Sequence, residues 1–95
     1  MKEVYRFEAV LQQNGTMDAA FVVFPYNLHA ETGRGRMHVK ATFDGVPYEG
    51  SIVNMGVKDA DSNVCYIIGV PKAIRIQTGK TFGDTLQVEI RMAEV

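Results

Sequence analysis

Basic side chains gather in two short stretches of this chain, and they are the residues best suited to bind a ligand. The stretches hold Arg34, Arg36, His38 and Lys40, and then Lys72, Arg75 and Lys80. Clustered arginine and lysine bind phosphates and other anions. The pattern predicts a local anion-binding or nucleic-acid-binding site, whose candidate residues are Arg34, Arg36, Lys40, Lys72 and Arg75.

A structural interpretation competes with this site. Lys72 and Lys80 would be solvated, and Arg75 would pair with a carboxylate such as Asp84. Ten Lys and Arg stand against eleven Asp and Glu, which gives a net charge of −1. The chain as a whole therefore creates no field that attracts polyanions, and any anion site has to be local.

Motifs for catalysis or metal binding are incomplete. Gly79-Lys80-Thr81 resembles the end of a phosphate-binding loop, but Ile74 stands where that loop needs glycine. The oxygen-bearing residues of 59–63 have the spacing of a calcium loop, whose glycine and glutamate are replaced by valines at 64 and 70.

The histidines and the cysteine complete this picture. His29, His38 and Cys65 lack the short spacing of metal ligands, and Cys65 lies in an apolar stretch typical of a buried thiol. We predict no catalytic residue, no metal and no cofactor.

An internal repeat organises the chain. The segment 25–33 and the segment 71–79, 46 positions later, share the pattern P-x-x-(L/I)-x-x-x-T-G. Proline favours the first helical position and glycine the left-handed residue after a helix, so each copy predicts a short helix. Alternating apolar residues follow each copy, as Met37, Val39 and Ala41 and as Leu86, Val88 and Ile90.

Period-two alternation predicts a mostly β protein. The expected strands cover residues 4–11, 17–24, 36–43, 48–54, 64–70 and 84–92, and the helices cover residues 26–32 and the segment after Pro71. Asn14-Gly15 and Asp44-Gly45 predict hairpin turns, the first of which would pair 4–11 with 17–24. Residues 56–63 lack periodicity and predict a loop.

Closure of the sheet is the expected architecture. Six strands on 95 residues would expose long edges in an open sheet, so we predict one domain, residues 1–95, forming a small closed six-stranded β-barrel flanked by two helices. Its halves, roughly 17–44 and 64–92, would be related by a pseudo-two-fold axis. Because one chain carries both halves, we expect a monomer rather than a homodimer.

Composition also bounds the location of the chain. Its start is too charged for a signal peptide, and its longest apolar run, 19–25, is too short to cross a bilayer. A single cysteine excludes an internal disulfide. We expect a cytoplasmic protein without a membrane partner.

Several segments resemble a bacterial family known as domain of unknown function 1905. They are Phe24-Pro25, Gly33, residues 44–51, 69–75 and 78–80, and residues 83–88, so the likeness covers almost the whole chain. The resemblance implies a double-split β-barrel. That fold is shared with looped-hinge-helix transcription regulators, which dimerise on DNA through basic residues, and the family itself has no assigned activity.

The sequence thus favours a non-enzymatic binding or interaction module whose partner the residues do not identify. The alternative is nucleic-acid binding through the local basic face, an argument by analogy with the regulators. A third hypothesis is ligand binding or hydrolysis in a pocket between barrel and helices, which requires a cleft with convergent polar groups. Tyr26, Tyr48 and Tyr66 are expected to cover the barrel ends rather than to stack on bases.

Overall fold

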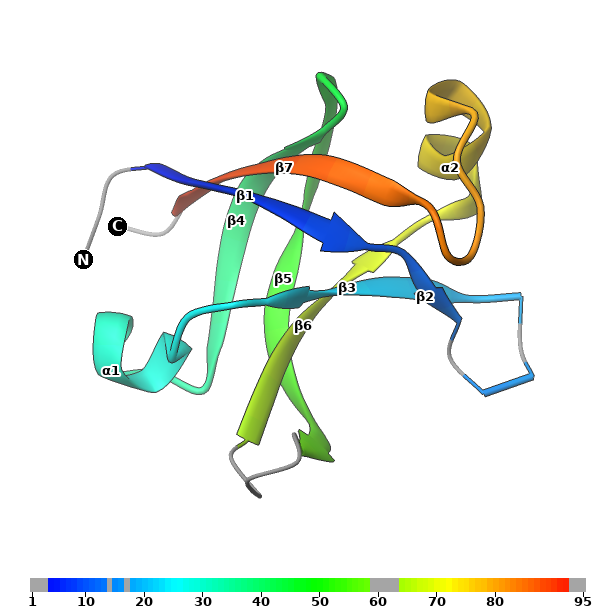
Figure 1. Ribbon diagram of the computed structural model, residues 1–95. Coiled ribbons are helices and arrows are strands. Elements are labelled where there is room, and N and C mark those ends of the chain that lie inside the picture. The colour runs from blue at the N-terminus through cyan, green and yellow to red at the C-terminus, as the bar shows by residue number, and fades with distance from the viewer. Residues whose placement is uncertain (1–3, 14, 17, 59–63, 93–95) are drawn as a thin grey trace.

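One curved β-sheet with two short helices forms the protein (Figure 1). The computed structural model describes residues 4–13, 15–16, 18–58 and 64–92. The strands are β1 (Val4–Val10), β2 (Gln12–Gln13), β3 (Ala20–Phe24), β4 (Arg36–Phe43), β5 (Val46–Lys58), β6 (Val64–Val70) and β7 (Thr85–Met92). The helices are α1 (Leu28–Thr32) and α2 (Lys72–Thr78). The prediction of a mostly β protein with two short helices is confirmed.

Within the described residues the sheet has seven strands in the order β1-β7-β4-β5-β6-β3-β2, rather than the six expected. The additional strand arises because the N-terminal stretch divides at Leu11. β1 pairs with β7, with Val4 opposite Arg91, whereas β2 pairs with β3, with Gln12 opposite Phe21. The first and last strands of the sheet order are therefore consecutive parts of one segment.

The hairpin predicted at Asn14-Gly15 is much shorter than expected. Within residues 4–13, only Gln12 and Gln13 pair with β3, because the backbone of Leu11 still bonds to the turn before β7. Its N–H donates to the carbonyl of Asp84 and its carbonyl accepts from the N–H of Gly83, both at 2.8 Å. The prediction that residues 4–11 pair with 17–24 was thus wrong. Asn14 itself lies outside the described residues.

The second hairpin is confirmed. Asp44 and Gly45 both have positive φ, 49° and 85°, as the tight turn between β4 and β5 requires. β5 then runs to Lys58, so the loop predicted from Gly56 was placed too early. The extension follows because β5 pairs first with β4 and then with β6.

Both helices begin later than their prolines suggested. The Asn27 side chain accepts the Ala30 N–H at 3.1 Å and caps α1, so Pro25 lies outside the helix. Pro71 is extended and is itself the capping residue of α2. The prediction that these prolines occupy the first helical position was wrong.

The ends of the helices match the prediction. Gly33 follows α1 with φ 75° and Gly79 follows α2 with φ 69°, the left-handed conformation that favours glycine. Each glycine turns the chain back toward the sheet, so α1 leads into β4 and α2 leads toward β7.

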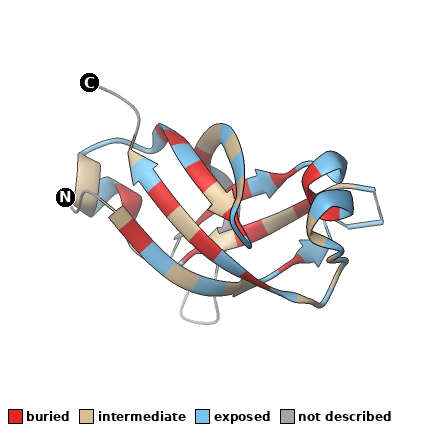
Figure 2. Ribbon diagram, turned by 90° about the horizontal axis from the view of Figure 1, so that it is seen from above, coloured by how far each residue is buried: buried red, intermediate tan, exposed pale blue. Residues whose placement is uncertain are grey.

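The core lies inside the curve of the sheet, where alternate strand residues are buried (Figure 2). Each helix adds one aliphatic side chain to it, Leu28 from α1 and Ile74 from α2. The largest fully buried side chains are Tyr5, Leu11, Phe24, Leu28, Phe43, Ile52, Ile68, Leu86 and Ile90. The opposite, wet face of the sheet carries the charged residues.

Candidate functional site

The outer surface of β4 presents basic residues at alternate positions. Arg36, His38 and Lys40 are exposed because the residues between them point into the core. Those inward residues are Met37, Val39 and Ala41, all buried. The alternation that builds the core therefore also aligns the three basic side chains on one face.

Neighbouring strands add charges to the same surface. Lys40 lies opposite Arg91 of β7 on one side and opposite Glu49 of β5 on the other. One row further, Arg6 of β1 lies opposite Glu89 of β7. Side chains directly opposite each other in such pairs have Cβ atoms about 4.5–5.5 Å apart. We call the surface of Arg6, Arg36, Lys40 and Arg91 the basic face.

Glu89 neutralises part of the basic face, and a second carboxylate, Glu49, lies beside it. Glu89 accepts from Arg6 Nε at 3.4 Å and from an Arg91 terminal nitrogen at 3.3 Å. Glu49 lies 3.9 Å from His38 Nε2. Arg36 and Lys40 form no ion pair with any residue that the structure describes.

A groove of about 420 Å³ lies on this surface where β5, β4 and β7 run side by side. Its lining residues are two cations, two carboxylates and four uncharged residues: Lys40, Arg91, Glu49, Glu89, Ala41, Thr42, Pro47 and Tyr48. The ring of Tyr48 packs toward the core and Phe43, so the outward part of the groove is formed mainly by the charged side chains, Thr42 and Pro47.

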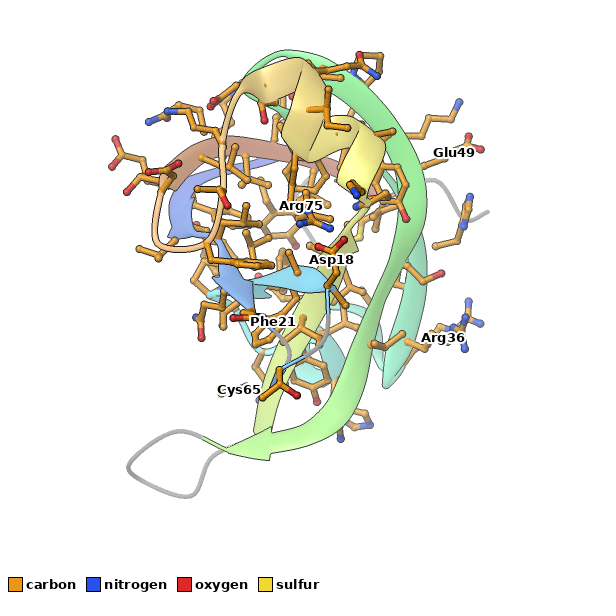
Figure 3. All side chains as sticks on the ribbon, turned by 90° about the vertical axis from the view of Figure 1, so that its right-hand side faces the viewer. Asp18, Phe21, Arg36, Glu49, Cys65 and Arg75 are labelled. Atoms are coloured by element: carbon orange, nitrogen blue, oxygen red, sulfur yellow. The ribbon has the colours of Figure 1, made fainter. Side chains whose placement is uncertain are left out.

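The basic residues of α2 belong to another part of the molecule. Arg75 is buried, and its Nη1 donates to Asp18 Oδ1 at 3.0 Å. Its Nη2 donates to the Asp18 carbonyl at 3.4 Å, and its guanidinium lies 5.2 Å from the centre of the Phe82 ring. Figure 3 shows Arg75 and Asp18 pointing toward one another, well apart from Arg36.

The prediction that Asp84 pairs with Arg75 was wrong. Asp84 instead accepts the backbone N–H of Thr81 at 2.8 Å and holds the turn before β7. Asp18 is the partner, and its second oxygen also lies 3.6 Å from Lys72 Nζ. The expected pairing of Arg75 with a carboxylate is therefore present, but the carboxylate comes from a distant segment of the chain.

The sequence-predicted site residues thus divide into two groups. Arg36 and Lys40 lie on the basic face, and Arg34 is exposed in the turn between α1 and β4. Lys72 and Arg75 meet at Asp18. Lys80, a further member of the second basic stretch, lies 3.8 Å from a carboxylate oxygen of Asp44.

Arg6 and Arg91 were missed as members of the site. Their outward direction follows from strand alternation, so each could be placed on a wet face from sequence alone. Strand order could not be deduced, and only the adjacency of β1, β7 and β4 brings them beside Lys40. If every possible strand order were considered, one of them would place these outward arginines beside Lys40.

Comparison with protein families finds a match over most of the chain. The family model described as domain of unknown function (DUF1905) matches residues 7–90, which include Arg36 and Lys40 of the basic face, whereas Arg6 and Arg91 lie just outside the match. The chain belongs to the DUF1905 family. The resemblance identified from the sequence is therefore confirmed, and the description of the DUF1905 family names no activity. No curated protein matches the chain.

Two further features of this DUF1905 domain concern membranes and metals. None of its described helices is long and apolar enough to cross a membrane. Among the described residues, no group of three or more His, Cys, Asp or Glu side chains is arranged to hold a metal ion. The calcium-like segment 59–63 lies outside those residues, and Cys65 is partly buried.

Asp18 has a perturbed titration with a clear cause. The hydrogen bond from Arg75, and then the positive charge of Arg75, hold the pKa of Asp18 below its usual value. The folded state therefore binds fewer protons here than the unfolded chain does. The resulting stabilisation is present above the ordinary aspartate pKa, about 3.9, and is lost as the pH falls through the lower folded value.

The substitution Asp18→Asn should lower the free energy of unfolding at pH 7, because it leaves the buried Arg75 guanidinium without its counter-ion. The difference from the wild-type protein should shrink as the pH falls below about 4. Urea unfolding of both proteins at a series of pH values measures this. Glu8→Gln, at an exposed position of β1, is the control and should leave stability at pH 7 unchanged. A gap between Asp18→Asn and wild type that persists undiminished at low pH would contradict the assignment.

Proposed function

We propose that this chain is a non-enzymatic binding module whose basic face holds a polyanion, with the phosphate backbone of a nucleic acid as the leading candidate. The observation that carries the proposal is the position of Arg36 and Lys40. Both are exposed on one strand, and neither has an ion-pair partner among the described residues. Cations free of internal partners keep their full charge for a ligand.

The spacing of the basic face suits a linear polyanion. Arg36 and Lys40 lie four positions apart on β4, which is about 13 Å of backbone. Arg91 lies opposite Lys40 and widens the cationic surface across the sheet. Successive phosphates of one nucleic-acid strand are about 3.4 Å apart along a duplex axis, so one strand laid along β4 can meet several cations at once.

We also propose that the sheet closes into a double-split barrel of two related halves in a monomeric chain. The order of strands begins with β1 and ends with β2, which are joined through Leu11, and this supports closure. β3 pairs antiparallel with β6, with Val22 opposite Ile68, residues 46 positions apart like the two prolines. Antiparallel pairing of corresponding strands is what a two-fold axis produces.

Binding of a labelled oligonucleotide, single-stranded or duplex, measured by fluorescence anisotropy, tests the proposed function. Affinity should fall steeply between about 50 and about 200 mM salt. The variant Arg36→Gln/Lys40→Gln should bind more weakly, and the slope of log affinity against log salt should decrease by roughly 0.7–0.9 for each phosphate that the variant no longer neutralises.

Lys72→Gln/Lys80→Gln is the matched control, because it removes the same charge from two lysines that already face carboxylates elsewhere. It should retain the wild-type slope. Absence of binding by the wild-type protein at low salt, or an equal loss of affinity in both double variants, would reject the basic face as the binding surface.

A further inference from the structure

A second recess, separate from the basic face, lies where α2 begins. It has a volume of about 330 Å³ and is lined by Asp18, Ala20, Tyr48, Val70, Lys72 and Arg75, among others. Its walls combine apolar groups with a buried guanidinium, which makes it chemically unlike the open sheet surface. We call it the α2 cleft.

The corresponding place beside α1 can be found from strand register. Tyr5 lies opposite Ile90 and Tyr48 lies opposite Ala41, while Ala41 and Ile90 face each other at the centre of the β4–β7 pairing. Tyr5 and Tyr48 therefore occupy corresponding positions on β1 and β5. Two residues further along, Phe7 corresponds to Gly50.

At the α1 end these positions are filled with rings. Tyr5, Phe7, Phe24 and Tyr26 pack together with centroids 5.1–6.3 Å apart. The residues in the corresponding places at the α2 end are Tyr48, Gly50, Val70 and Lys72. Three of four aromatic rings are thus absent there, and two of the residues without a ring, Val70 and Lys72, line the α2 cleft.

The ring of Tyr48 occupies part of the space above Gly50. A Cβ atom placed on Gly50 would lie 2.5 Å from Tyr48 Cε2, so the tyrosine ring folds over the glycine. The ring also lines the α2 cleft and gives it an aromatic wall. Ala20 and Val70 add aliphatic surface.

The charged end of the cleft is only partly satisfied by the protein itself. The Arg75 side chain is 10% exposed, whereas that of its partner Asp18 is 61% exposed. Arg75 Nε is buried and has no hydrogen-bond partner among the described residues. Water can solvate the exposed Asp18 carboxylate if it leaves, but the buried Arg75 guanidinium needs another anion in its place.

We propose that the α2 cleft binds a small organic carboxylate carrying an aromatic or apolar group, and that this carboxylate replaces Asp18 on Arg75. Guanidinium binds carboxylate with well-defined geometry, and Lys72 adds a second positive charge at the rim. The apolar part of the ligand would pack on Tyr48 and Val70, in the space that rings fill beside α1. Asp18 is then an internal competitor of the ligand.

Titration of the ¹⁵N-labelled protein with benzoate tests this, with benzamide as an uncharged control and acetate as a control that lacks the ring. Benzoate should shift the amide resonances around the α2 cleft, and both controls should bind more weakly. Asp18→Asn should bind benzoate roughly tenfold more tightly, because the competing carboxylate is gone.

Lys72→Tyr is the blocking variant, since it places at an exposed position the residue found at the corresponding place beside α1. It leaves the Asp18–Arg75 pair intact and should abolish benzoate binding. The proposal is overturned if benzamide binds as well as benzoate, or if neither wild type nor Asp18→Asn shows shifts at the cleft. Oligonucleotide binding by the same variants is measured separately, so failure of the cleft and failure of the basic face are distinguishable.

Discussion

Replacing Phe24 with alanine is expected to lower the free energy of unfolding by about 3–5 kcal/mol. Phe24 is 2% exposed, and its ring lies 5.3 Å from the centres of both Tyr5 and Tyr26 and 5.9 Å from that of Phe7. The substitution leaves a cavity among rigid rings that cannot easily collapse. Because small domains are stable by only about 5–15 kcal/mol, this is a large fraction of the total. Denaturant unfolding monitored by circular dichroism measures it.

Phe21→Ala provides the control on the same strand. Phe21 is only partly buried and lies on the other side of β3 from Phe24. Its truncation removes the same atoms without opening a cavity in the aromatic cluster, so the loss of stability should be clearly smaller. Equal losses for Phe21→Ala and Phe24→Ala would show that the cluster beside α1 contributes no special packing.

The second large effect is expected at Leu11, where β1 ends and β2 begins. Leu11 is fully buried, and its backbone bonds to Gly83 and Asp84 while the next residue turns to β3. Leu11→Ala should lower the free energy of unfolding by about 2–5 kcal/mol, the usual range for a buried leucine. Urea titration gives the value from the shift in midpoint at constant slope.

Val10→Ala is the neighbouring control, because Val10 is 48% exposed. Its effect should stay within about 1 kcal/mol, the span of strand preferences for exposed positions. If Val10→Ala were as damaging as Leu11→Ala, the loss of stability would come from weakened strand structure in general. It would not come from the buried Leu11 side chain at the point where the segment passes from β7 to β3.

Local features of the fold were accessible from the sequence. β4 and β6 have the predicted bounds because their alternation or apolar run is bounded by glycine, proline or a turn. Asp44-Gly45 and the glycines after both helices were assigned correctly, since the tolerance of a residue for positive φ depends on its own type. Helix starts were less accurate, because Asn27 competes with Pro25 as the signal for where α1 begins.

Long-range pairing was the part that sequence reasoning could not supply. Alternation shows that Arg6 and Arg91 point outward, but not that β7 lies between β1 and β4. The partner of Arg75 illustrates the same limit. Asp84 is near in sequence, yet its carboxylate is engaged by the Thr81 N–H, and Asp18 reaches the guanidinium only after β3 and β6 have paired.

The α2 cleft was anticipated only as a class of site, a recess between barrel and helix with convergent polar groups. The sequence pattern is alike in segments 25–33 and 71–79, and both helices end at a glycine with positive φ, but the residues around the cleft differ from those beside α1. In the proposed two-fold arrangement Gly50 and Lys72 stand in the places of Phe7 and Tyr26. The second correspondence follows from the 46-residue offset of the repeat, but the first becomes visible only with the strand register.

The pairing of β1 with β7 has a consequence for how the chain acquires its structure. Val4 and Arg91 are partners although nearly the whole sequence separates them, so this contact carries the largest loop-closure entropy in the sheet. Proteins dominated by such distant contacts reach the native state in milliseconds to seconds. During synthesis, β1 can pair only once β7 has emerged, so the unpaired edge of β1 is exposed until the last strand is made.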